Sequence, residues 1–308
     1  MVKVVTDSCS DIPGHIAQAL GITVVPLGVS FGDEIYQDGV DISADEFYAK
    51  LIKEPILPKT MAPSPGVFAE TYNRLATETD EIISIHISRK LSATYDSALL
   101  GKEQLEPTCH IEVIDSRMAS MGIGLLTITA ARAALAGADL DQITALIHQA
   151  IPRTHYFGLV DSLQYLHKGG RLGKGQAFLG SILNVKPLLE VKDGEVHPLE
   201  RVRSYPKALA RLCELAKRFS NVEELAITHA TTPDEAEALS TQLASLAPKG
   251  HMYKARLGSV IGTYLGPGAL AIALIEGEKN AKTQLLNQQV DAHPTPVAPH
   301  PHPPETPS

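Results

Sequence analysis

The chain has 308 residues, of which 44% are hydrophobic and 20% charged, and its formal net charge is −8. This composition is that of a soluble globular protein long enough for two domains. The acidic balance disfavours a nucleic-acid groove, which needs a basic face. No uninterrupted apolar run approaches the length of about 20 residues that spans a membrane. Three widely separated cysteines fit neither a disulfide framework nor a zinc site, so we expect a cytoplasmic protein.

The first half of the chain alternates strand-like and helix-like segments. The pattern predicts strands at residues 2–6, 22–27, 81–87 and 110–114, a helical turn at 15–20, and helices at 46–52, 66–78, 94–105, 118–135 and 139–151. Alternation of this kind predicts a mostly parallel sheet with helices on both faces. We therefore expect an N-terminal, Rossmann-like α/β domain over residues 1–155.

The pattern changes in the second half, where Asp193-Gly194 is a strong hairpin signal. Strands are predicted at residues 155–160, 187–191, 195–202, 225–229, 251–257 and 269–275, and helices at 176–183, 206–218 and 233–246. These elements predict an α+β domain with a mainly antiparallel sheet over residues 156–285. Residues 286–308 are rich in Pro and His and cannot bury enough apolar surface to offset their ordering entropy, so we expect a disordered tail.

Short polar clusters stand where strand-like runs of the sequence should end. They are Thr6-Asp7-Ser8, Lys59-Thr60, Leu91-Ser92-Ala93-Thr94 and Lys168-Gly169-Gly170-Arg171. The carboxyl ends of strands face the ligand crevice of an open α/β sheet. Hydroxyl groups together with one fixed guanidinium charge suit a small anionic head group. Helix capping and turn closure explain part of each cluster equally well, so both interpretations stay open at this point.

An enzyme is the alternative to a binding protein. Asp7 and Ser8, together with the Gly-rich loop at 168–175, could serve a phosphotransferase or a hydrolase. The sequence lacks the Gly-x-Ser-x-Gly elbow of many hydrolases and the P-loop of nucleotide enzymes. Cys9 is predicted to be a small, inert, half-buried side chain rather than a nucleophile. No motif in the chain indicates a metal or a cofactor.

A series of short motifs, each weak alone, occurs in a specific order along residues 2–277. They are Thr6-Asp7-Ser8 with Asp11, residues 36–42, Lys59-Thr60 with residues 63–66, Ile87-Ser88 with residues 91–95, residues 113–116, residues 163–171, residues 183–187, and Gly266-Pro267-Gly268. With this series the chain resembles the DegV family, which includes the bacterial fatty-acid-binding subunits of the fatty acid kinase system.

The resemblance implies a two-domain α/β protein that buries one long-chain fatty acid between its domains. Such a protein presents the carboxylate to a partner kinase subunit that forms an acyl phosphate, and it catalyses nothing itself. By the resemblance, Thr60 and Ser92 would bind the carboxylate, and Arg171 would be its charge partner. Tyr264 stands where many family members carry His, and a phenol can still donate a hydrogen bond. The supporting positions around this head-group site would be Thr6, Asp7, Ser8, Thr94 and Gly170.

Overall fold

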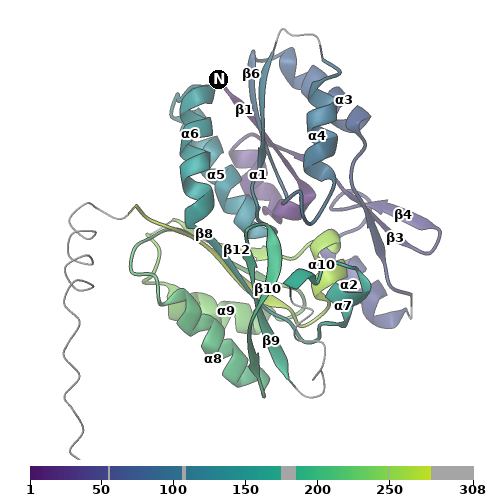
Figure 1. The fold of residues 1–308 in the computed structure, drawn as a ribbon, viewed down its shortest axis with the longest axis vertical. Helices are drawn as coiled ribbons and strands as arrows, with labels where there is room; N and C mark the ends of the chain where they lie inside the picture. The colour runs from purple at the N-terminus through teal and green to yellow at the C-terminus, as the bar shows by residue number, and fades with distance from the viewer. Residues whose placement is uncertain (55, 106–108, 175–184, 249, 279–308) are drawn as a thin grey trace, which may run out of the picture. The chain divides into compact units, whose positions relative to one another are not determined.

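The computed structural model describes residues 1–54, 56–105, 109–174, 185–248 and 250–278. Within it, Met1–Glu276 forms one compact unit with a mixed α/β fold, as expected (Figure 1). The helix predicted at 176–183 and the tail predicted at 286–308 lie outside the described residues. Among the described residues, no helix combines the length and the apolar character needed to cross a membrane.

A four-stranded parallel sheet in the order β2-β1-β6-β7 forms the centre of the first half. Its strands are β1 (Lys3–Asp7), β2 (Ile22–Val25), β6 (Glu81–His86) and β7 (His110–Asp115). Helices cover both faces, so its strands read as continuous apolar runs rather than as alternating ones. In Figure 1, α3 and α4 lie on one side of this sheet and α5 and α6 on the other. The helices are α1 (Gly14–Ala19), α3 (Pro65–Ala76), α4 (Thr94–Lys102), α5 (Met121–Leu135) and α6 (Leu140–Ala150).

The second half contains a six-stranded sheet in the order β10-β9-β8-β13-β11-β12. All neighbouring strands are antiparallel except β11 and β12, which are parallel. The strands are β8 (Thr154–Leu159), β9 (Lys186–Lys192), β10 (Glu195–Val202), β11 (Val222–His229), β12 (Met252–Arg256) and β13 (Leu270–Glu276). Helices α8 (Tyr205–Ala216) and α9 (Pro233–Leu243) cover one of its faces. Asp193 and Gly194 both have positive φ, which confirms the predicted two-residue hairpin turn.

Helix α5 packs against both sheets, with contacts to β1 on one side and to β8, β11 and β13 on the other. It is buried almost all round, which explains its apolar, Ala- and Gly-rich sequence. At Gly124 a Cβ atom would lie only 2.7 Å from the Ser10 carbonyl oxygen, so the close approach of the helix to that loop requires glycine. The domain boundary near residue 155 stays a prediction, because α5 joins both sheets into one compact unit.

A small three-stranded antiparallel sheet, in the order β4-β3-β5, was missing from the sequence prediction. It consists of β3 (Gly28–Phe31), β4 (Glu34–Gln37) and β5 (Lys59–Met61), with α2 (Ala44–Lys53) beside it in sequence. Strands of three or four residues are too short to show a clear period. The omission matters because β5 carries Thr60. Short elements also missing from the prediction are α7 (Gln164–Lys168), α10 (Ser259–Leu265) and the 3-10 turns Ser8–Ser10 and Ile151–Arg153.

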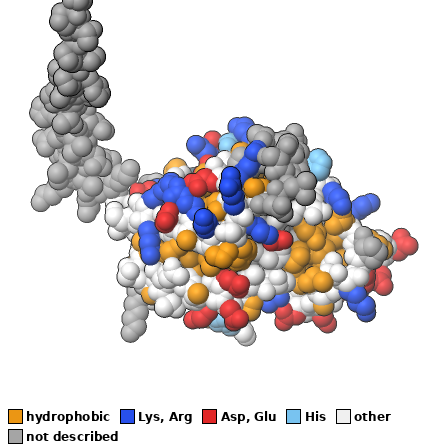
Figure 2. Space-filling model, turned by 90° about the horizontal axis from the view of Figure 1, so that it is seen from below, with side chains coloured by type: hydrophobic (Ala, Val, Ile, Leu, Met, Phe, Trp, Pro, Cys, Tyr) orange, Lys and Arg blue, Asp and Glu red, His pale blue; other side chains and the backbone are white. Residues whose placement is uncertain are grey.

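The surface seen in Figure 2 carries acidic, basic and hydrophobic side chains side by side. Lys and Arg side chains on this face are interspersed with Asp and Glu, and hydrophobic side chains are exposed in more than one area. A continuous basic stripe, which a nucleic-acid groove would need, is not visible on this face.

Candidate ligand-binding site

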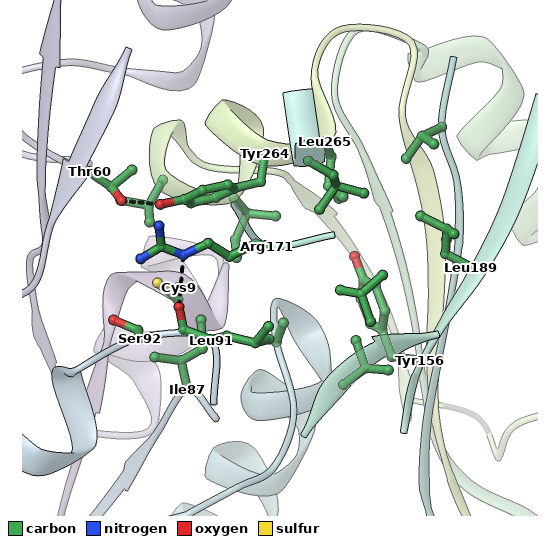
Figure 3. Close-up of a pocket in the computed structure, with 18 of the residues that line it drawn as sticks. Cys9, Thr60, Ile87, Leu91, Ser92, Tyr156, Arg171, Leu189, Tyr264 and Leu265 are labelled. Atoms are coloured by element: carbon green, nitrogen blue, oxygen red, sulfur yellow. Dashed lines mark hydrogen bonds between the residues drawn. The ribbon is translucent and has the colours of Figure 1, made fainter. Parts of the chain in front are cut away.

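The described residues line a mostly apolar cavity, whose empty space, including solvent at its mouth, is about 760 Å³. Its wall is built from the loop after β6, from strands β8, β9 and β10 and from helix α10. Both sheets therefore contribute to it. Figure 3 shows Thr60, Ser92 and Arg171 at one end of the cavity and Tyr156 with Leu189 at the other. The cavity is thus a long apolar space with a polar end.

The polar end contains all four head-group residues predicted from the sequence, namely Thr60, Ser92, Arg171 and Tyr264. The Thr60 Oγ1 and Tyr264 Oη atoms are 2.5 Å apart and share a hydrogen bond. The Arg171 guanidinium carbon lies 5.1 Å from the centroid of the Tyr264 ring, in a cation–π contact. Residues distant in sequence thus meet at one point, although their role in binding stays a prediction.

Arg171 is held in place by backbone acceptors rather than by an acidic side chain. Its Nε donates to the Leu91 carbonyl at 3.1 Å, and its Nη1 donates to the Gly169 carbonyl at 2.9 Å. Gly169 has no room for a side chain, since a Cβ there would lie 2.5 Å from the Tyr264 ring. Gly170 has a φ of +70°, which favours glycine. Because Arg171 forms no ion pair with an acid in the described part of the chain, its charge is available to an anion.

The Ser92 hydroxyl is positioned by its own loop and by the hairpin of the second sheet. Ser92 Oγ lies 2.8 Å from Thr94 Oγ1 and also accepts the Thr94 backbone N–H. Thr94 is fully buried and supports Ser92 without lining the cavity. At the start of the same loop, the buried Ser88 hydroxyl donates to the Gly194 carbonyl at 2.8 Å. The β9–β10 turn therefore anchors the loop that carries Ser92.

The first polar cluster of the sequence lies behind the cavity and supports it. The fully buried Asp7 accepts the backbone N–H groups of Cys9 and Ile87 and a hydrogen bond from His86 Nδ1 at 2.9 Å. Thr6 Oγ1 donates to the Ile85 carbonyl. These bonds tie the end of β1 to the end of β6, from which Cys9 and Ile87 reach the cavity wall. Ser8 belongs to the same support, because its Oγ accepts the Leu27 N–H.

A chain of hydrogen bonds like that of a hydrolase triad links Asp7, His86 and Ser84. In it, Ser84 Oγ lies 2.7 Å from His86 Nε2. Ser84 is fully buried, accepts a hydrogen bond from Tyr72, and does not line the cavity. A nucleophile needs access to its substrate. Asp7, His86 and Ser84 thus hold buried segments together instead of facing the ligand space, whereas Arg171 of the Gly-rich loop lines the cavity. Within the described residues, no group of three His, Cys, Asp or Glu side chains is arranged to hold a metal ion.

Cys9 and the apolar wall are the parts of the site that sequence reasoning missed. Cys9 was predicted to be half-buried, which is wrong: it is fully buried and lines the cavity. Burial, reinforced by the nearby carboxylates, raises the pKa of its thiol well above the usual value, which disfavours the nucleophilic thiolate. Wall residues such as Tyr156 and Leu189 lie in segments that the sequence predicts only as strands. No signal in the sequence distinguishes a core residue from one that faces a cavity.

Two buried carboxylates fix the start of α10, the helix that carries Tyr264. Asp11 accepts the Gly258 N–H at 2.8 Å and the Ser120 hydroxyl at 2.6 Å. Asp38 accepts both the backbone N–H and the hydroxyl of Ser259. Burial raises the pKa of Asp11 well above its ordinary value of 3.8 and raises that of Asp38 as well. Folding therefore favours the protonated form of each group.

The raised pKa of Asp11 has a consequence for stability. Its contribution is complete below the ordinary value of 3.8 and is lost as the pH rises through the folded-state pKa. In the wild type, Asp11 should make the free energy of unfolding fall as the pH rises from acid to neutral, by up to about 1.4 kcal/mol per pH unit. Asp11→Asn should remove this part of the fall. Asn can accept from Gly258 and donate to Ser120. Urea unfolding across the pH range measures this, with the exposed Asp33→Asn as control. Identical pH profiles for wild type and Asp11→Asn would contradict the assignment.

The chain is similar in sequence and in structure to members of one protein family. The family described as "Uncharacterised protein, DegV family" matches residues 1–277. A DegV domain-containing protein of Halalkalibacterium halodurans is 40% identical over 278 residues, covering 88% of this chain and 97% of that protein. A Thermus thermophilus structure, titled as fatty acid binding of a DegV family protein, has a TM-score of 0.83 and 32% identity and covers 90% of this chain and 99% of that one. Bacillus subtilis DegV, titled a fatty acid binding protein, gives 0.81 and 30% with the same coverage. The chain belongs to the DegV family.

Proposed function

We propose that this protein binds one long-chain fatty acid in the apolar cavity, with the carboxylate at the polar end. The observation that carries the proposal is a mostly apolar wall with the Thr60, Ser92 and Tyr264 hydroxyls and the Arg171 guanidinium gathered at one end (Figure 3). Among the described residues, that guanidinium has no acidic partner and donates to backbone carbonyls. A fatty acid has the same division between an apolar chain and one anionic group. The fatty-acid-binding relatives from Thermus thermophilus and Bacillus subtilis support this assignment.

The apolar chain would supply most of the affinity. About 14 buried methylenes at roughly 0.8 kcal/mol each give a gross gain near 11 kcal/mol, before the cost of ordering the ligand. The polar end then determines which end of the ligand points where. Arg171 would supply the charge, while Thr60, Ser92 and Tyr264 would supply hydrogen bonds. The hydrogen bond between Thr60 and Tyr264 would open to admit the carboxylate.

We further propose that the bound carboxylate is presented to a partner kinase in the cytoplasm. A carboxylate oxygen would bond to the terminal phosphorus of a nucleoside triphosphate held by the kinase, and the nucleoside diphosphate would leave. The product is an acyl phosphate. In this scheme the chain positions the substrate, and all bond-breaking chemistry belongs to the partner.

Extraction of the co-purified ligand tests the binding proposal. Protein purified under native conditions should release about one equivalent of fatty acid on denaturing extraction, identified by mass spectrometry. Recovery of no lipid, together with hydrolysis of an ester or a nucleotide by the protein alone, would refute the proposal. Adding a fatty acid kinase catalytic subunit, ATP and hydroxylamine tests presentation, because hydroxylamine traps an acyl phosphate as the acyl hydroxamate. Kinase-dependent hydroxamate is expected only when this protein is present.

A further inference from the structure

A second pocket lies against the polar end of the cavity, and we refer to it as the outer pocket. Its empty space, including solvent at its mouth, is about 900 Å³. Thr60, Arg171 and Tyr264 line both the cavity and the outer pocket. The two pockets therefore adjoin each other at these side chains. The outer pocket also includes Lys59 and Lys168.

The outer pocket concentrates positive charge in an acidic protein. Lys59, Lys168 and Arg171 line it, and none of the described residues that line it is acidic. In the described part of the chain, these cations form no ion pair with Asp or Glu, whereas many other lysines do. The paired lysines are Lys3, Lys50, Lys90, Lys174, Lys186 and Lys254. The protein has a net charge of −8, so a group of cations with no ion pair to Asp or Glu among the described residues is distinctive.

A carboxylate alone does not account for this charge. It carries one negative charge, for which Arg171 and the surrounding hydroxyls are sufficient. Lys59 and Lys168 add two more point charges in the outer pocket. Lysine binds phosphate as a point charge, whereas arginine binds carboxylate and phosphate through its planar fork. The set fits a more highly charged oxyanion placed next to the carboxylate position.

We propose that the outer pocket binds a phosphate-type oxyanion. This inference rests on the proposed function, which places the acyl head group at Thr60. Phosphorylation turns the charged carboxylate into the neutral carbonyl of a mixed anhydride and moves the negative charge outward onto the phosphoryl oxygens. The hydroxyls of Thr60 and Ser92 suit the carbonyl, while Lys59 and Lys168 suit the displaced charge. The oxyanion is either the phosphoryl group of an acyl phosphate or free phosphate beside a bound fatty acid.

The test compares two ligands on the delipidated full chain by titration calorimetry. One is palmitate, and the other is the β-ketophosphonate in which CH2 replaces the bridging oxygen of palmitoyl phosphate. We expect the double variant Lys59→Met, Lys168→Met to bind the ketophosphonate about tenfold more weakly and palmitate less than about threefold more weakly. Lys254→Met, which removes a cation paired with Glu237 elsewhere, is the matched control. The two lysines of the outer pocket are exposed, so their replacement should not unfold the protein. Retained palmitate binding would verify that the double variant is folded.

Equal losses for palmitate and the ketophosphonate would overturn the inference, as would binding of both the ketophosphonate and inorganic phosphate that does not depend on the two lysines. Failure of the wild type to bind palmitate would instead refute the proposed function. Inorganic phosphate added to the palmitate-loaded protein, followed by 31P NMR, distinguishes the two sources of the oxyanion. Lysine-dependent binding of inorganic phosphate supports the pocket as a site for free phosphate, and lysine-dependent binding of the ketophosphonate alone supports a phosphoryl group attached to the acyl chain.

Discussion

Replacing Arg171 by alanine is expected to weaken palmitate binding about 10- to 100-fold and hexadecanol binding by less than about threefold. The guanidinium interacts with the ligand through charge, and a hydrogen bond to a charged group contributes about 1.5–3 kcal/mol. An alcohol fills the same apolar cavity without a charge. Ser92→Ala should show the same selectivity with a smaller loss, since it removes one neutral donor.

Calorimetric titration of both ligands into delipidated protein measures this difference. Arg89→Ala is a suitable control, because Arg89 lies in the same loop region as Ser92, pairs with Asp96 and does not line the cavity. It should leave both affinities unchanged within about twofold. Equal weakening of palmitate and hexadecanol by Arg171→Ala would show that this residue supports the cavity wall rather than the carboxylate.

The largest effect on stability is expected at Asp7. Asp7→Ala should lower the free energy of unfolding by about 3 kcal/mol or more, because it leaves buried donors from Cys9, Ile87 and His86 without an acceptor. The loss should appear in urea unfolding of the delipidated protein, since bound ligand would stabilise the folded state by mass action.

Asp115→Ala provides the comparison for Asp7. Asp115 also ends a strand of the same sheet and accepts backbone N–H groups, from Arg89 and Arg117, but it is only partly buried. Its loss should cost about 1 kcal/mol. Similar costs at both positions would contradict the assigned role of Asp7. An enzymatic activity that Asp7→Asn abolished without loss of stability would support the enzyme alternative instead.

Much of the fold was predictable because its signals are local. Continuous apolar runs that alternate along the chain with helix-like segments indicated the parallel sheet. Asp193-Gly194 located the hairpin. Helix α6 begins after Asp139, which caps it through reciprocal hydrogen bonds with Gln142, another signal carried by neighbouring residues. Each signal depends on a few neighbouring residues. The three-stranded sheet escaped prediction because its strands are short and its partners distant: Lys59 pairs with Ser30.

The candidate site was predictable in part, through ordered motifs rather than through geometry. Thr60, Ser92, Arg171 and Tyr264 were named from the resemblance, and the structure brings them to one end of the cavity. Thr6, Asp7 and Ser8 belong to the support behind it instead. In sequence the three hydroxyl-bearing clusters look alike, because a hydroxyl that caps a turn and one that faces a ligand are the same group.

The sequence by itself determined the fold class, the hairpin and the residue types available for an anionic head group. Hydrophobic periodicity and turn chemistry are local properties, so the printed residues carry them directly. Only the tertiary structure decided that Thr60 and Tyr264 share a hydrogen bond, that Cys9 lines the cavity, and that the outer pocket shares Thr60, Arg171 and Tyr264 with the cavity. These features depend on which distant loops the two sheets bring together, and that choice is made by packing around α5 rather than by any local pattern.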